Sequence, residues 1–137
     1  MKKQSTPISW IKEEISMSNK SNLEAVAHYF FLVDHANDSQ EKFDELIAIY
    51  SDDVEAHSND GSVSYGKKEL IKNTRAFYDW MKGGESRHFY NVTKEDGKAD
   101  WAVSAKLADG NVMALAGHNV YEFNEKHQIK KLVVTNK

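Results

Sequence analysis

The run Val112–Phe123 constrains the fold more than any other stretch, because it is long, mostly apolar and broken by no residue except Gly117. Alternate side chains of a strand point to opposite faces of its sheet. One face of this run would carry Met113, Leu115, Gly117, Asn119, Tyr121 and Phe123, and the other Val112, Ala114, Ala116, His118, Val120 and Glu122. Both faces are largely apolar, which predicts a central strand covered on both sides. Asn119 would lie among apolar neighbours, where a polar side chain needs a partner or a function.

Three helices are predicted before this strand, over residues 22–36, 39–50 and 67–82. Ser21 and Glu24 have capping-box spacing ahead of the first helix, and Asp38 and Glu41 repeat that spacing ahead of the second. A short strand is expected after the second helix, ending at the turn signal of residues 59–61.

Four strands are predicted in the second half of the chain, as a meander over residues 86–135. Asp-Gly pairs between them are strong hairpin signals. In the second of these strands the odd-numbered residues form the apolar face, namely Ala99, Trp101, Val103, Ala105 and Leu107. Helices first and an antiparallel meander last indicate an α+β domain.

The chain of 137 residues is long enough for one domain with a sizeable core, which we assign to residues 21–137. Residues 1–20 would form an appendage with a short helix, since Thr6 and Pro7 suit a helix start. Ile8, Ile11 and Ile15 would then share one face of that helix.

Charge and composition limit the classes of partner and chemistry that we expect for this chain. The net charge is −3 and no basic stripe occurs, so nucleic acid is not an expected partner. No apolar run reaches the roughly 18 residues of a membrane span, and no signal-peptide pattern follows the N-terminus. We therefore expect a cytoplasmic protein without a membrane partner. The absence of cysteine excludes disulfides and thiolate chemistry.

Four strings, in this order and spacing, carry a resemblance to a known family: His28-Tyr29…Leu32-Val33-Asp34, Ile49-Tyr50-Ser51-Asp52-Asp53-Val54, Tyr65-Gly66-Lys67-Lys68-Glu69-Leu70-Ile71, and Val120-Tyr121-Glu122-Phe123…Ile129. Over roughly residues 22–135 the chain resembles the nuclear transport factor 2-like superfamily, specifically its SnoaL-like and ketosteroid-isomerase-like members. The resemblance implies a cystatin-like α+β cone, in which a curved antiparallel sheet packs against three helices around an apolar pocket. Such proteins include isomerases, polyketide cyclases, dehydratases, epoxide hydrolases and non-catalytic binding modules, so the fold does not settle activity.

Asn119 and His88 are the first two candidate catalytic residues that the resemblance implies. Asn119 falls at the position of an acidic pocket residue in the isomerases, where its amide could donate a hydrogen bond but could not exchange a proton. The alternative is a structural amide. His88 falls at the position of an acid/base histidine in the dehydratase-like members. The second histidine of that pattern would fall near the apolar Val103, so the alternative is a histidine held by a backbone partner.

Asp34 is the third candidate catalytic residue, since it could orient His88 or bind substrate. The alternative is a solvated residue near a helix end. Tyr29 matches a helix tyrosine that supports the isomerase oxyanion network, and its alternative is core packing. Ser58 falls near the position of the proton-moving aspartate, and serine cannot replace it without a base. The neighbouring His57 would face the opposite way, so no dyad is expected.

The substrate-binding walls are expected to comprise Tyr29, Ser58, Tyr90, Trp101, Val103 and Tyr121. The six histidines show no metal-binding spacing, so neither a metal nor a cofactor is expected.

Two functions remain open on the sequence. One is a cofactor-free cyclase, dehydratase or isomerase that moves a proton on an apolar, oxygenated small molecule. The other is a non-catalytic ligand-binding or dimerisation module of the same fold. The outer face of the central strand, with small residues such as Ala114 and Ala116, predicts a homodimer. The alternative is a monomer with the N-terminal segment folded over that face.

Overall fold

A computed structural model describes residues 22–81, 84–94 and 97–137, with the side chains of 88–94 left out. The predicted N-terminal helix of residues 1–20 and the predicted cap at Ser21 lie outside the described residues. No described helix is both long and apolar enough to cross a membrane.

The three predicted helices are confirmed within two residues at each described end. A first helix covers residues 22–35, α2 covers Gln40–Ala48 and α3 covers Gly66–Met81. The predicted cap of α2 at Asp38 is wrong, because the N-cap is Ser39. Ser39 has an extended backbone, and its Oγ accepts a hydrogen bond of 3.1 Å from the backbone N of Lys42.

Six strands form one sheet in the order β2-β1-β6-β5-β4-β3. The last four form the predicted antiparallel meander. The strands are β1 Tyr50–His57, β2 Val63–Tyr65, β3 Glu85–Lys94, β4 Lys98–Lys106, β5 Val112–Phe123 and β6 Ile129–Asn136. The expectation of a wholly antiparallel sheet needs correction, since β1 pairs parallel to β6 and makes the sheet mixed. The sequence analysis also missed β2, which is too short to show a strand period.

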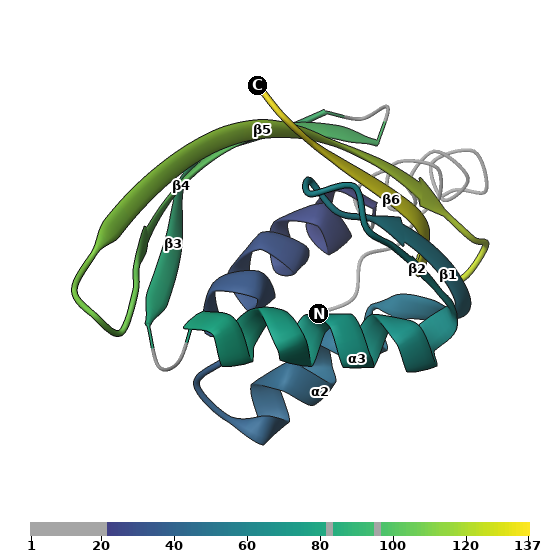
Figure 1. The fold of residues 1–137 in the computed structure, drawn as a ribbon. Coiled ribbons are helices and arrows are strands. Elements are labelled where there is room, and N and C mark those ends of the chain that lie inside the picture. Colours follow the sequence, from purple (N-terminus) through teal and green to yellow (C-terminus); the bar gives the residue numbers. More distant parts are fainter. Residues whose placement is uncertain (1–21, 82–83, 95–96) are drawn as a thin grey trace, which may run out of the picture.

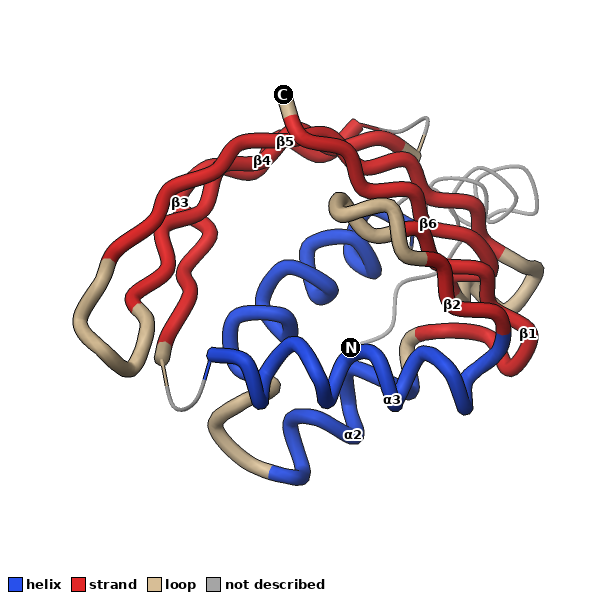
Figure 2. Tube along the Cα trace, in the orientation of Figure 1, coloured by secondary structure: helices blue, strands red, loops and turns tan. Residues whose placement is uncertain are grey.

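The sheet is strongly curved and arches over the helices (Figures 1 and 2). The helix of residues 22–35 and α3 lie on its concave side, and α2 lies further from the sheet (Figure 1). Shifts of register interrupt the ladders of β3 at 88/90 and β5 at 122/123. Such irregularities bend strands and increase their twist, which suits a sheet that closes around a cavity.

The two faces of β5 differ in burial. Gly117, Asn119 and Tyr121 on its concave face are buried, whereas Val112 on the outer face is 67% exposed. The prediction that β5 is covered on both faces is therefore wrong for the described part of the chain, because no described element packs against its outer side. On β4 the predicted apolar face is confirmed where Ala99 and Trp101 are buried.

Gly117 is required by the packing between β5 and β4. Trp101 on β4 is the residue directly opposite Gly117. A Cβ placed on Gly117 would lie 2.2 Å from Cζ2 of the Trp101 indole and 2.4 Å from the carbonyl oxygen of Thr135. The ring thus occupies the space that any other residue at position 117 would need.

We predict that Gly117→Ala lowers the free energy of unfolding by about 1–3 kcal/mol, since the added methyl must displace the indole or the strand. Chemical denaturation followed by far-ultraviolet circular dichroism measures the change. Ala114→Ser, which also adds one atom but on the exposed outer face of β5, is the matched control with little expected effect. Equal stability of Gly117→Ala and the wild type would contradict this account of the packing.

Candidate functional site

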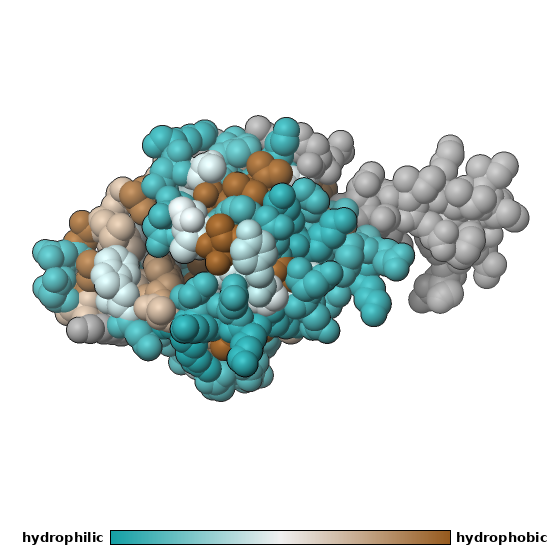
Figure 3. All heavy atoms as spheres, turned by 45° about the vertical axis from the view of Figure 1, so that its right-hand side comes forward, coloured by the Kyte–Doolittle hydropathy of each residue, from teal (hydrophilic) through white to brown (hydrophobic). Residues whose placement is uncertain are grey.

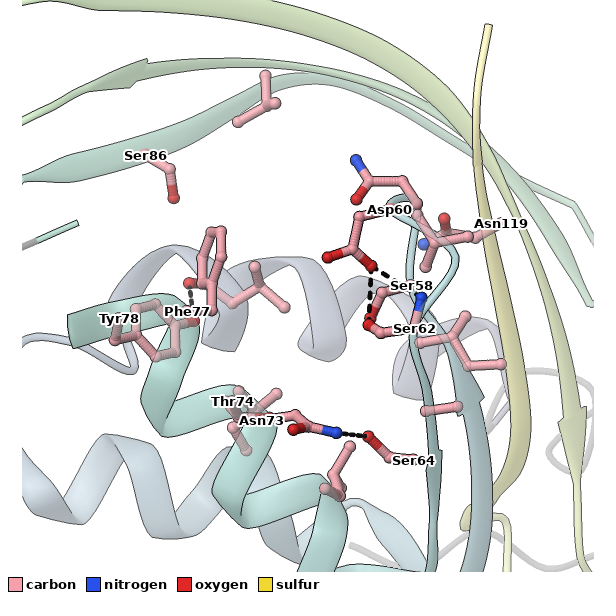
Figure 4. A pocket seen from close by; sticks show the side chains of 18 of the residues that line it. Ser58, Asp60, Ser62, Ser64, Asn73, Thr74, Phe77, Tyr78, Ser86 and Asn119 are labelled. Carbon is pink, nitrogen blue, oxygen red and sulfur yellow. Dashed lines mark hydrogen bonds between the residues drawn. The ribbon is translucent and has the colours of Figure 1, made fainter. Parts of the chain in front are cut away.

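A cavity of about 770 Å³ lies between the concave face of the sheet and the helices. This volume is within the range of small-molecule sites, on the order of 300–1,000 Å³. Its walls come from the first helix, α3, β4, β5 and β6, with apolar members Phe30, Val33, Leu70, Trp101, Val103, Met113, Leu115, Leu132 and Val134. Polar groups from the loop between β1 and β2 border it on one side (Figure 4). The space-filling view shows apolar side chains gathered on one side of an otherwise mostly hydrophilic face (Figure 3).

Asn119 lies in the cavity wall and is only 1% exposed. Its Oδ1 accepts a hydrogen bond of 2.8 Å from Nε1 of Trp101, and its Nδ2 donates one of 2.8 Å to Oη of Tyr121. A further hydrogen bond joins the same amide to the Tyr29 hydroxyl. Because the amide oxygen accepts from the indole N–H, the NH₂ group is the part of the amide that donates to the Tyr121 hydroxyl.

Tyr29 is the centre of a group of buried hydroxyls. It projects from the first helix, and Tyr50 reaches it from the start of β1. The hydroxyl of Tyr50 hydrogen-bonds that of Tyr29. The contacts of Tyr29 with Tyr50 and with Asn119 both lower the pKa of Tyr29.

Burial dominates the electrostatics of these tyrosines. Desolvation raises the pKa of Tyr29 to about 12, against the lowering effect of its hydrogen bonds to Tyr50 and Asn119. Desolvation likewise raises the pKa of Tyr50 and that of Tyr121 well above the ordinary value. All three hydroxyls are therefore neutral donors at physiological pH. Within the described residues, every buried side-chain nitrogen or oxygen has a hydrogen-bond partner.

Asp34 acts on this group through its charge, which adds to the effect of desolvation in raising the pKa of Tyr29. Its Oδ1 accepts a hydrogen bond of 3.4 Å from Oγ of Ser86, and its backbone oxygen accepts one of 3.1 Å from Nη1 of Arg87. These contacts join the end of the first helix to β3. Ser86 borders the cavity, whereas Asp34 does not.

The other predicted site residues fall into three groups. The cavity is bordered by Tyr29, Ser58, Trp101 and Val103. Tyr121 does not border it, but it accepts a hydrogen bond from Asn119, which does. His57 also borders the cavity, but its Nε2 lies 2.5 Å from Oε2 of Glu55, and no hydrogen bond joins it to Ser58. The side chains of His88 and Tyr90 lie outside the described residues. The backbone of His88 pairs with Val103.

Most polar residues of the cavity were not predicted from the sequence, Tyr50 and Asp60 among them. Tyr50 was placed at the end of the second predicted helix, although it begins β1 and contacts Tyr29. Asp60 was read only as part of a turn signal, and it borders the cavity from the loop between β1 and β2. The periodicity of the sequence does not reveal that either side chain borders the cavity, because their positions depend on how the chain turns in the folded protein. Among the described residues, no three acidic or histidine side chains are grouped to hold a metal ion.

Comparison with known proteins identifies the fold. Neither a protein-family model nor a curated protein matches the sequence. Among solved structures, an NTF2-like protein of unknown function from Exiguobacterium sp. 255-15 matches with 25% identity and a TM-score of 0.70, over 82% of this chain and 98% of that one. The chain therefore has the nuclear transport factor 2-like (NTF2-like) fold.

Two further structural matches carry names of enzymes. A provisionally assigned polyketide cyclase from Xanthomonas campestris pv. campestris is 15% identical, with a TM-score of 0.70 over 87% of this chain and 92% of that one. SalBIII, an epoxide hydrolase/cyclase-like enzyme of pyran ring formation in the polyether salinomycin, is 13% identical, with a TM-score of 0.65 over 86% and 92%. At these identities the matches establish the fold alone.

The tyrosine group predicts how stability depends on alkaline pH. A tyrosine whose pKa is raised from 10.0 to about 12 contributes stability that is complete below pH 10 and lost as pH rises through 12. Tyr29→Phe should therefore lose less of its unfolding free energy across this window than the wild type does, by roughly 2 kcal/mol. Denaturation curves across the window measure the difference. Tyr65→Phe, at a position 63% exposed, is the control, and identical pH dependence in all three proteins would contradict the prediction.

Proposed function

We propose that the protein binds an apolar, oxygenated small molecule in the cavity, with an oxygen of that molecule accepting a hydrogen bond from the Tyr29 hydroxyl. The observation that carries the proposal is the buried Tyr29 hydroxyl in the cavity wall, whose raised pKa of about 12 keeps its O–H protonated and able to donate at neutral pH. A preorganised donor in a desolvated site binds a carbonyl or a developing oxyanion more strongly than it would in water.

Asn119 then acts on the ligand through Tyr29. Its amide donates to Tyr121, and its oxygen accepts from Trp101. Its contact with Tyr29 would position the Tyr29 hydroxyl, as would the contact of Tyr50 with Tyr29. The apolar walls fit a body with few polar groups, since each unpaired polar group of a ligand buried there would cost free energy.

Proton-transfer catalysis is the second candidate function. It is supported by the names of two structural matches, a provisionally assigned polyketide cyclase and an epoxide hydrolase/cyclase-like enzyme. His88 would be the acid/base, and its strand position beside the cavity-wall residue Val103 suits that role. Asp34 would orient it from the end of the first helix, since Asp34 contacts Ser86, which lies two residues before His88 on β3.

A small ketone tests both functions at once. We predict that 2-tetralone binds the wild type in an NMR titration and that Tyr29→Phe weakens binding about tenfold, because the carbonyl loses its buried donor. If the protein is an enzyme of this kind, the α-protons of bound 2-tetralone exchange with D₂O faster than in buffer. His88→Gln should then slow exchange while leaving binding unchanged.

The control is Tyr65→Phe, which removes a hydroxyl from an exposed position away from the cavity. Equal binding by the wild type and Tyr29→Phe would overturn the role of Tyr29. Binding without accelerated exchange would favour the non-catalytic module. Native mass spectrometry of freshly purified protein gives an independent answer, since a ligand that copurifies reports its own mass.

We also propose that the protein forms a homodimer through the outer face of the sheet. Val112, Ala114 and Ala116 are exposed on β5, and no described element covers them. Small and apolar side chains on a broad sheet surface are a common basis for twofold pairing.

We predict that light scattering coupled to size exclusion gives the mass of two chains at micromolar concentration. Ala116→Arg should reduce it to one chain of 15.6 kDa, since a charge at the centre of the interface would lack a partner. Ala48→Arg, at an exposed position of α2, is the matched control. A single-chain mass for the wild type would reject the dimer.

A further inference from the structure

The loop between β1 and β2 places a carboxylate at the border of the cavity. Asp60 lies in this loop and borders the cavity together with Ser58 and Ser62. Oδ1 of Asp60 accepts two hydrogen bonds from Ser62, of 2.9 Å from the backbone N and 2.7 Å from Oγ. Both bonds end on Oδ1, and the other carboxylate oxygen points into the open space of the cavity (Figure 4).

A second turn in the same chain has the same hydrogen bond from a backbone N–H to an aspartate side chain two residues earlier. In the turn between β4 and β5, Oδ1 of Asp109 accepts a hydrogen bond of 2.9 Å from the backbone N of Asn111. Gly110 there has a φ of 91°, and Gly61 in the first turn has a φ of 90°. Asparagine supports such a turn as well as aspartate does. The turn therefore does not depend on the charge of Asp60, and Asp109 does not border the cavity.

The charge of Asp60 has no cationic counterpart in the cavity. None of the described residues that line it is lysine or arginine. Arg75 on α3 points elsewhere, since its guanidinium lies 3.8 Å from the Phe43 ring centroid and donates to Gln40. His57 also borders the cavity, but its ring contacts Glu55. The hydrogen bonds from Ser62 lower the pKa of Asp60, which keeps the carboxylate ionised at neutral pH.

Two exposed aromatic side chains of α3 also border the cavity. Phe77 and Trp80 of α3 border the cavity and are 46% and 54% exposed, with ring centroids 6.0 Å apart. Figure 4 shows Phe77 on the opposite side of the open space from Asp60. Aromatic faces attract cations and offer no partner to a carboxylate.

We propose that Asp60, across the cavity from the ring of Phe77, forms a cation-accepting subsite of the cavity, so that the ligand is an apolar molecule carrying a protonated amine. This inference rests on the proposed ligand-binding function of the same cavity and adds the charge class of the ligand. It excludes molecules that bear a carboxylate or phosphate near this end, because the anion would face a fixed negative charge without a cation to offset it.

Three compounds with one body and different charges test the inference: 1-adamantanamine, 1-adamantanol and 1-adamantanecarboxylate. We expect the amine to bind the wild type about three- to tenfold more tightly than the alcohol, and the carboxylate more weakly than either, by isothermal titration calorimetry. The differences are modest because Asp60 is exposed to solvent, and they should shrink as salt is raised.

Asp60→Asn should bring the three affinities together, because it keeps the turn and removes the charge. Asp109→Asn makes the same change in the matching turn away from the cavity and should leave the order unchanged. Equal affinities of the wild type for amine and carboxylate, or the same order in Asp60→Asn, would overturn the subsite while leaving the cavity as a binding site. If none of the three compounds binds, the proposed function fails and the subsite fails with it.

Discussion

The hydrogen bond from the Trp101 indole to the Asn119 amide oxygen is the interaction on which the interior depends. It fixes the orientation of the amide, and so it decides that Asn119 donates to Tyr121. In a buried site an amide turned the other way would leave the indole N–H without an acceptor, at a cost of about 1–3 kcal/mol.

The position of the Trp101 indole depends on the absence of a side chain at Gly117. Trp101 can lie against β5 only because residue 117 has no Cβ, and Gly117 and Asn119 are neighbours on the same face of that strand. The packing of Trp101 against Gly117 and its hydrogen bond to Asn119 thus both depend on the pairing of β4 with β5. Since the sheet is curved and the helices lie inside it, this pair of strands also forms a wall of the cavity (Figures 1 and 4).

The cavity has largely apolar walls and two polar parts, the tyrosine group and the loop between β1 and β2. At the tyrosine group all hydroxyls are neutral, since desolvation raises the pKa of each. At the loop between β1 and β2 the carboxylate of Asp60 is exposed to solvent and remains charged. Burial decides the difference, because ionisation is penalised where water is excluded and tolerated where it is not. A ligand that spans both surfaces would meet a hydrogen-bond donor at one and a negative charge at the other.

The sequence by itself determined the helices, the meander and the importance of Asn119, because side-chain periods and turn residues are local signals. It also placed Trp101 and Val103 on the inner face of their strand. Only the tertiary structure decided that β1 pairs parallel to β6, that Ser39 rather than Asp38 caps α2, and that Tyr50 reaches Tyr29. It likewise turned Asp60 from a turn residue into part of a cavity wall. The cap of α2 is a local choice between neighbouring residues. The other outcomes depend on segments far apart in the chain being brought together, and no local period records which distant partner a strand or a hydroxyl will meet.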